Sequence, residues 1–230
     1  GLSPTPLNNP NGIRWSTNLG YLSLSRHRMN LTIRANCDVQ KVLFKDKTAV
    51  GLEVRSGGEI FTVEAGNVIL SGGAIASPQL LMISGIGPAE HLEEHRIDLI
   101  HNLPGVGQNL RDHPVLPVTF KTKPAVPLDG LAPRNQYMLR YTATGSTSRN
   151  DMVIMMFNFA SERLERGGSR LDGVGIRMTL SLYLAESSGE LTLQSKDPSV
   201  QPFLNYNYFE KPFDRERMRE GIHKCLELAK

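Results

Sequence analysis

The 230-residue chain has few cysteines, little net charge and no long apolar run, and each shortage excludes a class of protein. Cys37 and Cys225 are too few for a disulfide-stapled scaffold or a multi-cysteine zinc site. No run approaches the roughly 18 apolar residues of a membrane-spanning helix, so we expect no transmembrane segment. A net charge of +3, spread along the chain, predicts no nucleic-acid partner. No leader is visible at the start, which leaves the compartment unknown, with the cytoplasm slightly favoured.

Apolar residues make up 40% of the chain and charged residues 21%, which is typical of a protein with a buried core. Both ends of the sequence look cut. The chain starts in a loop-like string, and it stops in an amphipathic helix, residues 214–230, that has no C-cap. We interpret the chain as an internal fragment of a longer protein. A frayed helix and a loose terminus remain the alternative.

Three short runs between residues 39 and 64 predict an antiparallel meander, because turn residues separate them at 45–47 and 56–58. The runs are Val39–Phe44, Ala49–Arg55 and Glu59–Glu64. The next run, Asn67–Leu70, is apolar without alternation, which is typical of a strand inside a parallel sheet. The meander is therefore interpreted as an insertion between parallel strands.

Small residues follow this run. Ser71, Gly72 and Gly73 precede a helix with Ser77 as its predicted N-cap and Pro78 at its first position. Such a corner lets a ligand approach the backbone, and the free N–H groups of a helix start favour an anion. A tightly packed corner between a strand and a helix also needs small residues, so the residues alone leave both interpretations open.

Two other patterns suggest chemistry and are interpreted as structural. His91, Glu94 and His95 have the spacing of an inverted zinc-protease motif, but their helix spans barely two turns and no further carboxylate ligand clearly follows. We predict a solvated helix face and no metal site. Gly105 and Gly107 form half of a dinucleotide fingerprint and predict only a turn.

The sequence changes character near residue 112, after which prolines punctuate a loosely patterned segment. Residues 152–159, 174–184 and 191–193 predict antiparallel strands, with hairpin turns at Gly167–Gly168 and at Ser187–Gly189. We therefore place a domain boundary between residues 1–112 and 113–230.

The stretch from Gly73 to Gly87, GAIASPQLLMISGIG, resembles the second signature of the glucose–methanol–choline (GMC) oxidoreductases. Residues 28–33 and the stretch LPGVGQNLRDH at 103–113 resemble the parts of that family on either side. The resemblance implies an α/β fold, α+β overall. Residues 1–112 would be part of an FAD-binding parallel-sheet domain with the antiparallel meander inserted. Residues 113–230 would be part of a substrate-binding domain with an antiparallel sheet.

In function, the resemblance implies a choline dehydrogenase-like flavoprotein that oxidises the CH–OH group of a small-molecule alcohol by hydride transfer to FAD. Two alternatives stay open, because one scaffold hosts several reactions. One is an FAD-containing protein similar to hydroxynitrile lyases, and the other is a non-catalytic flavin-binding relative.

Carried over residue by residue, the resemblance implies that the nucleotide half of FAD meets Val39, Ser71, Gly72 and Gly73. An ordinary core valine is the alternative for Val39. His113 and Val115 are implied on the substrate side, although a buried structural histidine is the alternative for His113. Choline-oxidising members carry a glutamate where Val115 stands here. This difference favours an uncharged, more apolar alcohol.

No catalytic residue is assigned within the chain, since the family's catalytic histidine is expected beyond Lys230 and its diphosphate-binding glycine motif before Gly1. We expect the isolated chain neither to hold FAD tightly nor to oxidise an alcohol. The sequence identifies neither the alcohol, nor the electron acceptor, nor the oligomeric state.

Overall fold

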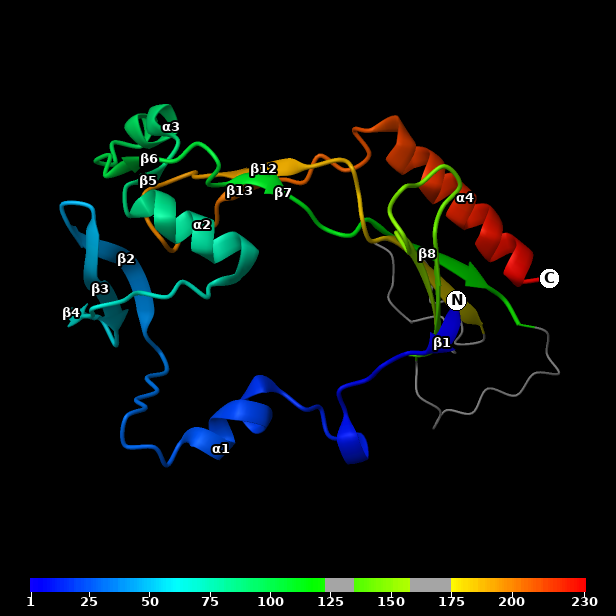
Figure 1. The fold of residues 1–230 in the computed structure, drawn as a ribbon, viewed down its shortest axis with the longest axis horizontal. Helices are drawn as coiled ribbons and strands as arrows, with labels where there is room; N and C mark the ends of the chain where they lie inside the picture. The colour runs from blue at the N-terminus through cyan, green and yellow to red at the C-terminus, as the bar shows by residue number, and fades with distance from the viewer. Residues whose placement is uncertain (123–134, 158–174) are drawn as a thin grey trace. The chain divides into compact units, whose positions relative to one another are not determined.

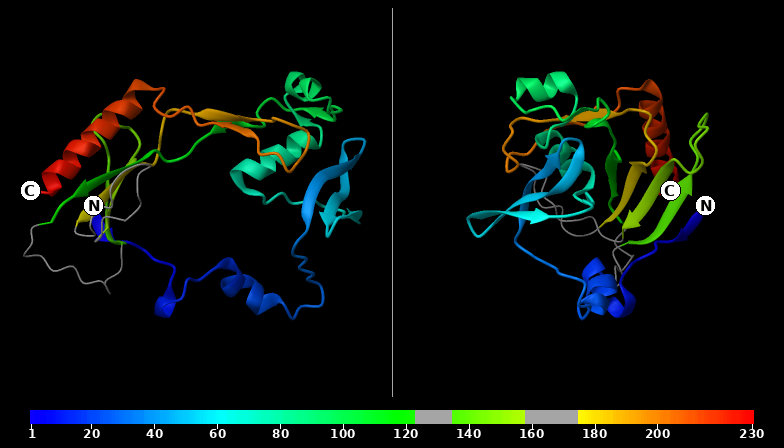
Figure 2. Two further views of the ribbon diagram at one scale, coloured as in Figure 1. Left: turned by 180° about the vertical axis from the view of Figure 1, so that it is seen from behind. Right: turned by 60° about the vertical axis from the view of Figure 1, so that its left-hand side comes forward.

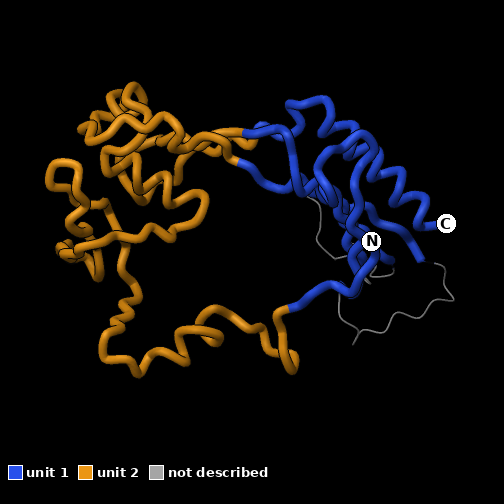
Figure 3. Tube along the Cα trace, viewed as in Figure 1, with its two compact units in different colours: residues 1–7, 111–188, 207–230 blue, residues 8–110, 189–206 orange. Residues whose placement is uncertain are grey.

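The computed structural model describes residues 1–122, 135–157 and 175–230, and the chain forms two compact units. Figure 3 shows unit 1, which comprises residues 1–7, 111–188 and 207–230, and unit 2, which comprises residues 8–110 and 189–206. The division into domains at residue 112 concerns the longer protein and stays a prediction.

Unit 1 is built on a five-stranded antiparallel sheet, with strand order β1-β9-β10-β11-β8. The strands are β1 (Leu2–Pro4), β8 (Val115–Phe120), β9 (Asn135–Tyr141), β10 (Met152–Phe157) and β11 (Ile176–Leu182). Helix α4 (Pro212–Leu228) lies along one face of this sheet (Figures 1 and 2). The two layers enclose the core of unit 1.

Alternation along β11 decides which side chains enter that core. Met178, Leu180 and Leu182 are buried on the face toward α4, where they pack with Met218 and Cys225 of the helix. Thr179 and Ser181, at the intervening positions, belong to the opposite face. The prediction of a helix over 214–230 is confirmed in outline, as α4 begins at Pro212 and ends at Leu228.

The strands predicted at 152–159 and 174–184 are confirmed as β10 and β11, which pair in antiparallel register. Residues 158, 159 and 174 of these predictions, and the predicted turn at Gly167–Gly168, lie outside the described residues.

The hairpin predicted at Ser187–Gly189 is wrong, because β11 and β12 (Gly189–Thr192) belong to different sheets. The Ser187 backbone N–H donates to Asp214 Oδ2 over 2.8 Å, and its hydroxyl accepts the Lys211 N–H over 3.0 Å. These residues therefore bond to the start of α4 instead of closing a hairpin.

In unit 2, the predicted meander is confirmed as β2 (Asp38–Lys45), β3 (Thr48–Ser56) and β4 (Glu59–Glu64), paired antiparallel in that order. The turns fall where the turn residues predicted them. Asp46 and Gly57 have positive φ values of 56° and 58°, a conformation that aspartate and glycine adopt more readily than most residues.

The strand predicted at Asn67–Leu70 is not present, since these residues pair with no strand in the described part of the chain. Ile69 is 87% exposed instead of buried. An apolar run becomes a strand only where neighbouring strands offer hydrogen-bond partners. The one parallel pair within the described residues joins β5 (Ile86–Gly87) to β6 (His101–Asn102).

Helix α2 (Gly73–Ile83) begins four residues before the predicted N-cap, so Ser77 lies inside the helix and Gly72 is its N-cap. Pro78 is tolerated within α2, because it removes only one hydrogen bond near the start of the helix. Helix α3 (Ala89–Glu94) confirms the predicted short helix.

A second core in unit 2 joins α2, α3 and β12 through Met82, Leu92, Val106, Leu191 and Leu193. Strand β12 pairs antiparallel with its neighbours β13 and β7. The remaining elements are β7 (Gln108–Leu110), β13 (Phe203–Asn205), α1 (Ser23–Ser25) and the short turns of helix at Pro10–Gly12 and Asn18–Leu22. Within the described ranges, no helix has the length and apolar character to cross a membrane.

Candidate functional site

A cavity of about 470 Å³ in unit 2 contains the corner that the sequence singled out. Its walls are the start of β2, part of β3, the segment that precedes α2, α2 itself and the turn at Pro198 and Ser199. The lining residues are Cys37, Asp38, Val39, Gln40, Leu52, Arg55, Val68, Ile69, Leu70, Ser71, Gly72, Ala76, Ser77, Gln79, Leu80, Ile83, Pro198 and Ser199. Its volume falls within the range of about 300–1,000 Å³ that is common for small-molecule sites.

Three of the four residues predicted to meet FAD, namely Val39, Ser71 and Gly72, line this one cavity. Val39 is half-buried against it and is not a fully buried core valine. Gly73 is not among the lining residues. It begins α2 with φ at +78°, a left-handed conformation that costs glycine little because it has no Cβ.

The walls of the cavity are fixed to one another by Ser84 at the end of α2. The Val42 N–H of β2 donates to Ser84 Oγ over 2.8 Å, and this hydroxyl donates to the Leu80 carbonyl over 2.6 Å. The side chain of Ser84 is buried, so this bridge is shielded from competing water.

Gln79 was missed by the sequence reasoning, although it lies within the signature stretch. Its side-chain amide donates to the carbonyls of Val200 over 2.8 Å and of Pro198 over 3.3 Å, and so holds the 198–200 turn against α2. Next to this turn, hydrogen bonds from the backbone N–H and the hydroxyl of Ser199 lower the pKa of Asp197. Because Val200 lies 121 residues after Gln79 in the sequence, no local pattern indicated this role of Gln79.

The cavity combines apolar walls with polar groups of several kinds, which fits the nucleotide half of FAD. Val39 and Leu80 offer surface for a flat ring, and the Ser71 and Ser77 hydroxyls can donate to or accept from a sugar or a phosphate. Arg55, which pairs in register with Asp38, adds a cation near an expected anion. No side-chain pattern in β3 marked Arg55 in advance.

The two substrate-side candidates lie together at the start of β8 in unit 1. The His113 ring is stacked on the Tyr183 ring, with centroids 4.2 Å apart and planes 10° apart. Val115 is 54% exposed and lies opposite Ser181 in the β8–β11 register. His113 is exposed, so it is not the buried structural histidine that was the alternative.

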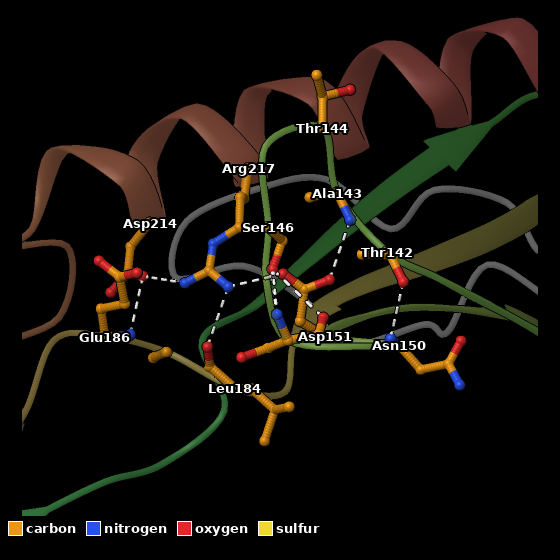
Figure 4. Close-up of polar contacts among 12 residues, drawn as sticks. Thr142, Ala143, Thr144, Ser146, Asn150, Asp151, Leu184, Glu186, Asp214 and Arg217 are labelled. Atoms are coloured by element: carbon orange, nitrogen blue, oxygen red, sulfur yellow. Dashed lines mark hydrogen bonds and ion pairs between the residues drawn. The ribbon is translucent and has the colours of Figure 1, made fainter.

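A buried ion cluster supports this end of the sheet (Figure 4). Arg217 of α4 donates to Asp151 Oδ2 over 2.7 Å, to the Leu184 carbonyl over 3.0 Å, and to Asp214 Oδ1. Burial alone would raise the pKa of Asp151, but hydrogen bonds from Arg217, Ser146 and the Ala143 N–H outweigh it and hold this pKa below its ordinary value.

The pKa of Asp214 follows the same balance. Burial acts to raise it, whereas hydrogen bonds from the Ser187 hydroxyl, the backbone N–H groups of Glu186 and Ser187, and Arg217 lower it below its ordinary value. The cluster is therefore an arginine held between two ionised carboxylates, and its chemistry is structural.

The zinc-like pattern has a structural explanation at its first histidine. The His91 Nε2 atom accepts the Leu193 N–H over 2.9 Å, and its Nδ1 lies 3.5 Å from Glu94 Oε2. His91 thus joins α3 to the chain just beyond β12. Among residues 1–122, 135–157 and 175–230, no group of three or more metal-ligating side chains comes together.

Comparison with known proteins finds one family that matches most of the chain. The GMC oxidoreductase family matches residues 2–115 with its N-terminal part and residues 185–230 with its C-terminal part. An oxygen-dependent choline dehydrogenase of Photobacterium profundum is 31% identical over 250 residues, which cover 99% of this chain and 44% of the relative. The chain thus spans less than half the length of this curated relative.

Two solved structures share the fold. Pyridoxine 4-oxidase from Mesorbium loti superposes with a TM-score of 0.86 at 24% identity, covering 97% of this chain and 44% of that one. A variant of Aspergillus oryzae formate oxidase, studied for its effect on FAD modification, gives a TM-score of 0.79 at 23% identity over 89% of this chain and 44% of that one. The mixed α/β fold with antiparallel sheets is common to all three.

Proposed function

Because this chain belongs to the GMC oxidoreductase family, we propose that the protein containing it uses FAD to oxidise the CH–OH group of a small-molecule alcohol. When bound, FAD supplies the acceptor for the hydride that leaves the carbinol carbon. In this proposal, unit 2 contributes to the FAD-binding domain and unit 1 to the substrate-binding domain. The catalytic histidine that the resemblance implies would come from outside these 230 residues.

The cavity beside α2 is the observation that carries the proposal. Val39, Ser71 and Gly72 were assigned to FAD from the resemblance alone, and they line one cavity of suitable size. Residues of this chain would hold the nucleotide half there. The apolar walls would exclude water from one ring, and Ser71 and Ser77 would hydrogen-bond the polar part.

We further propose that the alcohol is uncharged and approaches the sheet of unit 1 near His113 and Val115. A valine at that position offers contact area but no negative charge, so a quaternary ammonium group would gain no ion pair there. Choline, which the relative from Photobacterium profundum is named for, should therefore be a poorer substrate than a neutral alcohol of similar size.

Anaerobic titration of the FAD-loaded protein with a panel of primary alcohols tests this function. Loss of the oxidised flavin absorbance on mixing with an alcohol is the expected result, with butanol and benzyl alcohol acting at lower concentrations than choline. A flavin that stays oxidised with every alcohol, while the protein cleaves a cyanohydrin, would instead assign it to the lyases. Reoxidation by oxygen or by an artificial acceptor then identifies the class of electron acceptor.

A further inference from the structure

The contact between His113 and Tyr183 follows from the pairing of their strands. The last paired residues of β8 and β11 are Val115 and Ser181, and the Leu182 N–H continues the ladder by donating to the Pro114 carbonyl over 3.1 Å. One further step of antiparallel register brings Tyr183 opposite His113 on the same face as Val115. The rings meet there with planes 10° apart.

Both members of the stack are anchored by their own backbones. The His113 N–H donates to Asp112 Oδ1 over 2.7 Å, and the Tyr208 hydroxyl donates to the other oxygen of that carboxylate over 2.9 Å. The Tyr183 N–H donates to the Asp151 carbonyl over 2.8 Å, and Asp151 belongs to the buried ion cluster. These hydrogen bonds fix the main chain at both positions, and so they keep the two Cα atoms at a spacing at which the rings can stack.

The stack covers one face of the imidazole and leaves its edge accessible. Within the part of the chain that the structure describes, neither ring nitrogen of His113 has a hydrogen-bond partner. A hydrogen bond to an imidazole nitrogen lies in the plane of the ring, so whatever sets that plane sets the direction of the bond. An exposed histidine without such a stack would sample several rotamers.

We propose that Tyr183 is a positioning residue, which fixes the plane of the His113 imidazole so that its ring nitrogens meet the bound alcohol in one direction. This inference rests on the proposed function. The neighbouring Ser181 supports a polar contact on this face, because its hydroxyl is buried and has no hydrogen-bond partner among the described residues. Preorganised groups of this kind lose less entropy when a ligand binds.

The test compares two substitutions at Tyr183 in the FAD-loaded protein that contains this chain. Tyr183→Leu removes the ring, whereas Tyr183→Phe keeps it and removes only the hydroxyl. Tyr137→Leu is the matched control, since Tyr137 is a 47% exposed tyrosine on β9 of the same sheet. If Tyr183→Leu fails to fold, Tyr183→Gln replaces it.

The first measurement does not depend on turnover. With ¹³C-labelled histidine, the ring resonances of His113, assigned by their loss in His113→Gln, should be shifted upfield by the tyrosine ring. Tyr183→Leu should remove that shift, and Tyr183→Phe and Tyr137→Leu should keep it. A His113 signal that is indifferent to Tyr183→Leu would overturn the proposal.

The second measurement is the kcat/KM for an alcohol that reduces the flavin. We expect Tyr183→Leu to lower kcat/KM about tenfold or more, and Tyr183→Phe to retain most of the wild-type value. The double variant Tyr183→Leu with His113→Ala should have the same kcat/KM as His113→Ala alone, because a positioning residue has no effect once the ring it positions is gone. Additive losses in the double variant would contradict a positioning role. A wild-type flavin that no alcohol reduces would instead refute the proposed function, with the resonance test still deciding whether the stack exists.

Discussion

The Arg217 guanidinium donates to the Asp151 carboxylate over 2.7 Å, although 66 residues separate the two along the chain. Asp214, one turn before Arg217 on α4, accepts from the same guanidinium. The cluster therefore fixes α4 to the turn between β9 and β10, and through the Leu184 carbonyl to the segment after β11. All three side chains are buried, so each charge depends on its partners.

Replacing Arg217 should destabilise unit 1 strongly. Arg217→Met leaves two buried carboxylates without their cation, which costs about 3–5 kcal/mol in the free energy of unfolding. Lys211→Met is the control, because Lys211 and Glu210 form an exposed pair worth at most about 1 kcal/mol. Urea unfolding followed by circular dichroism measures both, and equal effects of the two substitutions would refute the role given to the cluster.

The cluster should also give the protein a specific acid sensitivity. Because the pKa values of Asp151 and Asp214 are lower in the folded than in the unfolded state, their contribution to stability is complete above the ordinary aspartate pKa of about 4. It disappears as the pH falls through the lower, folded pKa. The stability difference between wild type and Asp214→Asn should therefore narrow below about pH 4.

Urea unfolding at intervals from pH 7 to about pH 3 provides this measurement. Asp46→Asn, in the exposed turn between β2 and β3, is the reference substitution. If the difference in free energy of unfolding between wild type and Asp214→Asn stayed constant down to the lowest pH, Asp214 would not be stabilised as an anion in the folded protein.

The two cysteines should differ sharply in reactivity. Burial raises the pKa of Cys225 to about 11, and this side chain is inaccessible in the core of unit 1. Cys37 is half-buried at the edge of the candidate FAD cavity. In the 230-residue chain at pH 8, a thiol reagent should modify Cys37 quickly and Cys225 only after denaturation.

Single substitutions assign these two reactions. Cys225→Ser should keep the fast reaction, and Cys37→Ser should lose it. A fast reaction that persists in Cys37→Ser would mean that the core between α4 and the sheet is open to solvent.

Gly107 and Gly105 offer a matched pair for testing the turn before β7. Gly107 has φ at +83°, and a Cβ built there would lie 2.3 Å from the Leu191 carbonyl oxygen, whereas a Cβ at Gly105 meets nothing within 4 Å. Gly107→Ala should lower the free energy of unfolding by about 2 kcal/mol or more, whereas Gly105→Ala should change it by less than about 0.5 kcal/mol. Thermal unfolding of both variants checks this, and similar midpoints would show that the contact with Leu191 is not close.

The sequence predicted the meander well because its signals are local. Turn residues at Asp46 and Gly57 end the strands where the structure ends them. The start of α2 was placed five residues late, since a serine followed by proline is the stronger local signal. The structure instead begins the helix at Gly73 and continues it through Ser77. Asn67–Leu70 was assigned to a strand that forms only where partner strands are present.

The parts that could not be predicted depend on contacts between distant residues. The hydrogen bonds of Gln79 to Val200 and of Arg217 to Asp151 join residues that are far apart in the sequence, so no local pattern indicates them. A buried charged cluster is also contrary to the usual expectation that Asp and Arg stay at the surface. For the candidate site, the resemblance placed Val39, Ser71 and Gly72 together, whereas Arg55 and Ser199 joined them without any pattern of their own.

Equilibrium binding of FAD to two tryptophan variants tests the central claim most directly, namely that the cavity beside α2 holds the nucleotide half of FAD. In Val39→Trp the indole fills part of the cavity, whereas Val50→Trp places the same ring at a 38% exposed position on β3 outside it. In the protein that contains this chain, Val39→Trp should weaken FAD binding about tenfold or more, and Val50→Trp should leave it within about twofold of wild type. Equal affinity for FAD in Val39→Trp and wild type, with both folded by circular dichroism, would contradict the account.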